Sequence, residues 1–166
     1  MIHYLEPLAV ATNITQATFC RLDEVLVTWG VLTTTFGRMD SSENAEARQT
    51  VLDSLEKRWH ASDQLVFIMS VLLNPYIKSA VFNTTSPATR IFFSVTNVVE
   101  AAGFLYYRFF GVAAPPNSIY SNYEDYLKGI GEYKGLKLSC DQVEARAKNE
   151  VNKYIECYYL MNHFDF

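Results

Sequence analysis

Residues 86–110 read SPATRIFFSVTNVVEAAGFLYYRFF, an almost continuous apolar stretch. Ser86 followed by Pro87 is a typical helix start, because serine accepts hydrogen bonds from the first turn and proline at the first helical position has no N–H to leave unsatisfied. Apolar side chains then fall on nearly every side of the helix, which is typical of a helix covered by several neighbours. We therefore predict a long apolar central helix that ends near Phe110.

Capping patterns upstream predict further helices. Asn13 with Gln16 three positions later indicates a helix that reaches about Phe36, and Asp40 with Glu43 indicates a second one. Residues 65–73 form a short apolar run that fits either a buried strand or a buried helix. We favour a helix, because the Asn74-Pro75 pair that follows would stop it.

Two capping patterns lie downstream. Ser121 with Glu124 predicts a short acidic helix, and Ser139 with Gln142 predicts the last helix. The glycines between residues 129 and 135 predict a loop. Together the patterns predict an all-α fold, an irregular bundle of about six to eight helices around the central one, in a single domain of residues 1–166.

Composition agrees with this prediction. Of 166 residues 49% are hydrophobic and 19% are charged, and only 7 glycines and 5 prolines interrupt them, which disfavours disorder and turn-rich sandwiches. The net charge of −4 offers no basic excess to neutralise many phosphates, so autonomous DNA binding is not expected. Three unevenly spaced cysteines fit a reducing, intracellular compartment, and we expect no membrane span.

Most motifs for catalysis are absent. Neither a phosphate-binding glycine loop nor a metal-binding Cys/His spacing occurs, so we expect no cofactor and no metal. His60 follows Glu56 by one turn, which favours a surface hydrogen bond over a catalytic pair. The adjacent acids Asp23-Glu24 and Glu124-Asp125 do not converge on a helix, so we expect them to be solvated, unless Asp23 pairs with a neighbouring helix. The tyrosines at 120, 123, 126 and 133 stand among acids, which favours packing over nucleic-acid stacking.

Several short runs, in order and spacing, resemble the hAT-type transposase-derived proteins abundant in fungi. They are EPLAVATN (6–13), RLDEVL (21–26), LEKRW (55–59), VFI (66–68), LNPYI (73–77), YRFF (107–110) and YEDYL (123–127). The resemblance spans roughly residues 5–133 and is weaker over 136–166. In that family a large helical insertion interrupts a ribonuclease H-like catalytic fold, and these motifs lie in the helical part.

The resemblance implies that this chain is a non-catalytic helical segment of a degenerate or truncated DNA transposase from a transposable element. The family's acidic triad lies outside the matching region, so no catalytic residue is carried over. The implied partners are the rest of a transposase or a second copy of the chain, with DNA bound only weakly, and the implied location is the nucleus. The motif residues expected to be structural are Arg21, Leu22, Asp23, Arg58, Trp59, Leu73, Asn74 and Pro75.

Two alternatives stay open. A stand-alone helical protein-interaction module would use the 14% aromatic content for its interface and would have no role on DNA. An uncharacterised helical enzyme would need convergent polar groups in a pocket, and no sequence motif supports one.

Overall fold

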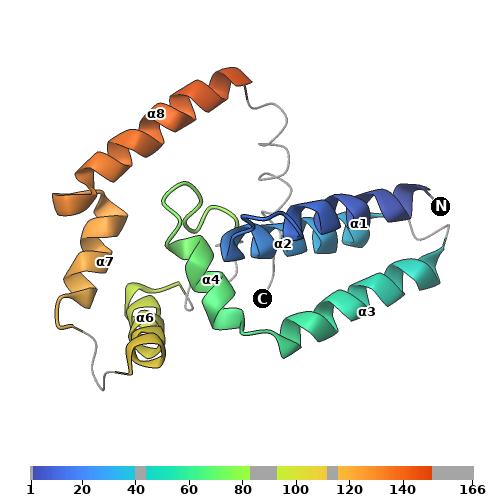
Figure 1. The fold of residues 1–166 in the computed structure, drawn as a ribbon, viewed down its shortest axis with the longest axis horizontal. Coiled ribbons are helices and arrows are strands. Elements are labelled where there is room, and N and C mark those ends of the chain that lie inside the picture. Colours follow the sequence, from blue (N-terminus) through green and yellow to red (C-terminus); the bar gives the residue numbers. More distant parts are fainter. Residues whose placement is uncertain (1, 40–43, 83–92, 112–115, 151–166) are drawn as a thin grey trace.

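The structure is a computed structural model that describes residues 2–39, 44–82, 93–111 and 116–150. Every regular element in these ranges is helical, which confirms the predicted all-α fold (Figure 1). The elements are α1 (Ile2–Thr15), α2 (Leu22–Arg38), α3 (Ala45–Ala61), α4 (Gln64–Leu72), α6 (Val95–Phe110), α7 (Ile119–Lys128), the 3₁₀ turn η1 (Gly131–Tyr133) and α8 (Lys134–Glu150).

The central position belongs to α2. It packs against α1, α3 and α4, and the packing then continues from α4 through α6 and α7 to η1 and α8. Its N-terminal half contributes Leu26 to the larger core, which also contains Met69 and Val71 of α4 and Val98 of α6. The C-terminal half of α2 contributes to a second core, described next.

The second core lies between α1, α2 and α3. Phe36 is fully buried at its centre, together with Leu32 and Ala11. The Arg48 guanidinium of α3 closes this end of α2, because its Nε donates to the Phe36 carbonyl oxygen over 2.7 Å. Carbonyls in the last turn of a helix have no partner within the helix, so this bond satisfies one that would otherwise depend on water.

The predicted helix over residues 13–36 is wrong, because the chain forms two helices there. Asn13 lies inside α1, which ends two residues later, and α2 begins only at Leu22. The stronger start signal is at Arg21, whose backbone N–H donates to the Glu24 carboxylate over 3.1 Å. Two carboxylates in the first turn also favour a helix start here, because they interact with the positive end of the helix dipole.

Other predicted boundaries move as well. The short apolar run is a helix, α4, and it ends before Asn74-Pro75 as predicted. The helix predicted from Ser121 begins two residues earlier, and the one predicted from Ser139 begins at Lys134, so that Gly135 is helical. The predicted caps at Asp40 and Ser86 fall outside the described residues.

The predicted central helix is not central. The described helix α6 begins at Val95, where the Ser94 hydroxyl accepts a hydrogen bond from the Asn97 backbone N–H. It buries Val98 and Leu105 against neighbours, whereas aromatic side chains on its other side remain exposed. The helix therefore has apolar residues on all sides, but the described part of the chain covers only one of these sides.

Candidate functional site

The RLDEVL and LNPYI motifs meet in space. Asp23 at the start of α2 receives hydrogen bonds from the Arg21 guanidinium, from Nε to Oδ1 over 3.0 Å and from Nη2 to Oδ2 over 2.7 Å. Across the chain, Asn74 Nδ2 donates to Asp23 Oδ2 over 2.5 Å, and Asn74 Oδ1 accepts from the Tyr76 backbone N–H over 2.9 Å. We call Arg21, Asp23 and Asn74 the carboxylate junction. It ties residues 51 positions apart in the sequence.

The carboxylate junction keeps a buried charge in place. Only 7% of the Asp23 side chain is exposed, and burial alone raises the pKa of a carboxyl group. The hydrogen bonds from Arg21 and Asn74 outweigh that effect and hold the pKa of Asp23 below its usual value. The prediction that Asp23 and Glu24 form a solvated pair is therefore wrong for Asp23, because its two partners replace water.

The remaining motif residues do not join the carboxylate junction. Trp59 is half-buried and meets Trp29 of α2 edge-on, with ring centroids 5.8 Å apart, which fits the predicted role of an anchor. Arg58 is exposed beside a groove described below. Leu22 and Leu73 are also exposed, and Pro75 lies in the turn after α4.

Tyr126 fixes α7 to the end of α4, a contact that no motif revealed. Its hydroxyl donates to the Leu72 carbonyl oxygen over 3.0 Å in a buried environment, and the Lys78 ammonium lies 5.2 Å from its ring centroid. Burial, followed by neighbouring groups, raises the pKa of Tyr126 to about 12, so the phenol remains a donor at neutral pH. Its ring also packs against Tyr123 and Tyr133, which confirms packing for these tyrosines, while Tyr120 is exposed.

Surface ion pairs account for other charged candidates. Arg108 of α6 pairs with Asp63, which precedes α4, and so links two helices of the larger core. His60 and Glu56 lie 3.6 Å apart, with both side chains largely exposed, as expected of a surface pair. No cluster of three or more metal-ligating side chains occurs among the described residues.

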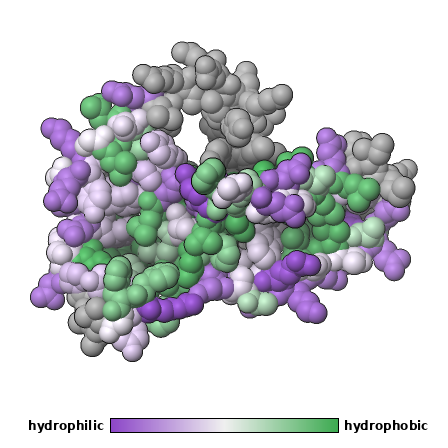
Figure 2. All heavy atoms as spheres, viewed as in Figure 1, coloured by the Kyte–Doolittle hydropathy of each residue, from purple (hydrophilic) through white to green (hydrophobic). Residues whose placement is uncertain are grey.

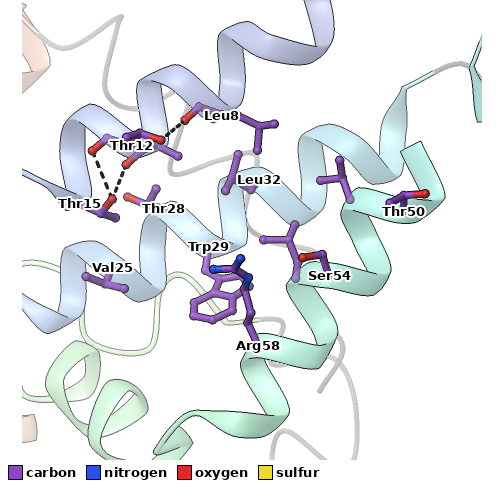
Figure 3. A pocket seen from close by; sticks show the side chains of 13 residues that line it. Leu8, Thr12, Thr15, Val25, Thr28, Trp29, Leu32, Thr50, Ser54 and Arg58 are labelled. Atoms are coloured by element: carbon purple, nitrogen blue, oxygen red, sulfur yellow. Dashed lines mark hydrogen bonds between the residues drawn. The ribbon is translucent and has the colours of Figure 1, made fainter. Parts of the chain in front are cut away.

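A groove of about 560 Å³ lies over α2, between α1 and α3 (Figure 3). Neither the capping patterns nor the family motifs revealed it. The residues that line it are Leu8, Ala11, Thr12, Thr15, Val25, Thr28, Trp29, Leu32, Thr50, Val51, Ser54, Leu55 and Arg58. Its volume falls within the range of about 300–1,000 Å³ that is typical of small-molecule sites.

The hydroxyl groups of the groove differ in their partners. Thr12 Oγ1 donates to the Leu8 carbonyl oxygen over 2.7 Å, and Thr15 Oγ1 donates to that of Ala11 over 2.9 Å. Thr28 is 93% buried, yet no hydrogen bond to its hydroxyl is found within the described ranges. Figure 3 shows its side chain directed from α2 toward α1. The sequence held one signal for Thr28. It is a polar residue at helical spacing from two apolar ones, three positions after Val25 and four before Leu32.

Comparisons with known proteins do not assign this chain. No family model, curated protein or solved structure matches it. Over the part of the chain that the structure describes, no helix has both the length and the apolar content to cross a membrane.

Proposed function

We propose that this chain is a non-catalytic helical segment of an hAT-like transposase-derived protein, and that it serves in packing and assembly. The observation that carries the proposal is the carboxylate junction. Two motifs that resemble the family, RLDEVL and LNPYI, supply its three residues, and the contact between them orients α2 against the end of α4. Motif residues that build a scaffold in this way support a structural role for the segment.

An exposed aromatic face supplies the assembly surface. Phe104, Tyr107 and Phe110 follow one another at intervals of three along α6, opposite the buried Val98 and Leu105, and each is more than half exposed. Figure 2 shows further hydrophobic side chains at the surface over α1. Contiguous exposed apolar residues mark interaction surfaces in soluble proteins. In this proposal the aromatic face of α6 packs against the remainder of a transposase-like protein, or against a second copy.

Sedimentation of the purified chain tests the proposal at two salt concentrations, with and without a short DNA duplex. We expect self-association that salt leaves unchanged, because apolar contacts carry it, and that the double substitution Phe104→Ser/Phe110→Ser abolishes. Tyr120→Ser, at an exposed tyrosine of α7, is the matched control and should leave association intact.

Two outcomes would contradict the proposal. A chain that stays monomeric at all concentrations, and that does not bind the catalytic fold of an hAT transposase, has no assembly surface. A DNA complex that weakens steeply with salt would mean that phosphate contacts, and not packing, are the main role of the segment. If the chain forms a discrete dimer and does not bind the catalytic fold of an hAT transposase, the result would instead favour the stand-alone interaction module.

A further inference from the structure

We propose that the groove between α1, α2 and α3 binds a single-chain amphiphile with a carboxylate head group, a ligand of the fatty-acid type. This inference does not depend on the proposed assembly role, because the groove and the aromatic face of α6 involve different helices. It depends on the volume of the groove, on a buried threonine in its lining, and on the charge in one half.

Hydroxyl groups line the groove along its length, but its charged side chain lies in one half. Because α1 and α3 both run antiparallel to α2, Thr15, Thr28 and Arg58 lie toward the end where α2 begins. Leu8 and Leu32 lie in the opposite half, which also holds the uncharged Thr50 and Ser54 of α3 (Figure 3). One charged half and one uncharged half suit an amphiphile, whereas a uniformly apolar molecule would leave the charged half unused.

Thr28 provides a buried polar group for the ligand. The residue is 93% buried, and its hydroxyl lacks a hydrogen-bond partner in the ranges that the structure describes, although buried polar groups are nearly always hydrogen-bonded. The other threonines of the groove do not share this state. Thr12, Thr15 and Thr50 each donate to a carbonyl of their own helix. A ligand oxygen, directly or through a bound water, would satisfy Thr28.

Arg58 determines the sign of the head group. Among the described residues its guanidinium has no ion pair, and the positions three and four residues away on α3 hold no acidic side chain. No acidic residue lines the groove. A guanidinium with its planar fork of donors pairs well with a carboxylate, which it binds through two parallel hydrogen bonds. The charge of the groove therefore complements an anionic head group.

The proposed occupant is a small molecule, because the volume of about 560 Å³ lies within the range of small-molecule sites. The surface of the lining is mostly apolar, which suits a flexible hydrocarbon chain. Trp29 lies in the lining, so its fluorescence should respond to a bound ligand.

Titration of the full chain with dodecanoate, below its micelle concentration, tests the proposal through tryptophan fluorescence. We expect saturable binding at one site per chain. Arg58→Gln should weaken dodecanoate binding by about tenfold or more while leaving dodecanol binding nearly unchanged, because only the charged head group loses its partner. Lys57→Gln is the matched control, since it removes an exposed neighbouring cation that does not line the groove.

A second variant tests the location. Ser54→Trp adds bulk at an exposed position of the lining, where folding should tolerate it. It is expected to abolish binding of both probes, measured by calorimetry because the added tryptophan changes the fluorescence. Three results would overturn the proposal: no saturable binding of dodecanoate, equal losses in the Arg58→Gln and Lys57→Gln variants, or unchanged affinity in Ser54→Trp. Self-association that Ser54→Trp abolishes, with no dodecanoate binding, would assign the groove to a second copy of the chain.

Discussion

Removing the Asn74 side chain isolates the contribution of the carboxylate junction to stability. In Asn74→Ala the buried Asp23 carboxylate loses the donor that lies 2.5 Å away, and the Tyr76 backbone N–H loses its acceptor. A hydrogen bond to a charged group contributes about 1.5–3 kcal/mol, and one between neutral groups contributes about 0.5–1.5 kcal/mol. We therefore expect the free energy of unfolding to fall by about 2–4 kcal/mol, a large part of the usual total of about 5–15 kcal/mol.

Urea unfolding followed by circular dichroism at neutral pH measures this change. For a slope of about 2 kcal/mol per molar urea, the midpoint should fall by about 1–2 M with the slope unchanged. Asn122→Ala is the matched control. It removes an exposed asparagine within α7 and should leave the midpoint unchanged or slightly higher, because alanine is the better helix former.

One result would refute the reasoning. If Asn74→Ala and Asn122→Ala unfold at midpoints that agree with that of the unaltered chain, the contact between the two motifs contributes nothing to the fold. The structural role proposed for both motifs would then lose its support.

Three further changes probe the Tyr126 contact, the end of α7 and the carboxylate junction. Tyr126→Phe should cost about 1–3 kcal/mol in urea unfolding, because the last carbonyl of α4 is left buried without its donor, whereas Tyr120→Phe should cost nothing. Gly129→Ala should lower the thermal midpoint, since φ is +62° and a Cβ would lie 2.5 Å from a lysine side-chain carbon. Gly135→Ala, in open space within α8, should raise it slightly. The native pKa of Asp23 lies below its unfolded value of 3.8, so its stabilisation is complete above that pH and is lost as pH falls toward the native pKa. Acid titration should therefore cost the unaltered chain more stability than Asp23→Asn.

Sequence patterns predicted the helices better than their ends. The apolar run before Asn74-Pro75 could be assigned to a helix because proline gives an unambiguous stop. In contrast, α1 is not among the predicted helices. It carries Pro7 in its second turn and no clear cap, so it exists through its packing on α2, which sequence periodicity does not report.

The same limit applies to the candidate sites: sequence patterns indicated local features but not contacts between distant segments. The short motifs indicated residues 21–23 and 73–75 as structural, but nothing in their spacing showed that Asp23 and Asn74 touch. A contact between distant segments depends on how α2 and α4 cross. The groove is harder still to predict from the sequence, because it exists only where three helices meet and bury Thr28.

Because α2 belongs to both cores, the two cores are joined through one backbone. Leu26 lies in the larger core and Phe36 in the smaller, ten residues apart on the same helix. If either core opened alone, half of this 17-residue helix would lose its packing partners. Isolated helices shorter than about 12–15 residues are marginal in water, so that half would not stay folded. The amide protons of α2 should therefore exchange with solvent at one common rate, set by unfolding of the whole unit, while those of α8 exchange independently and sooner.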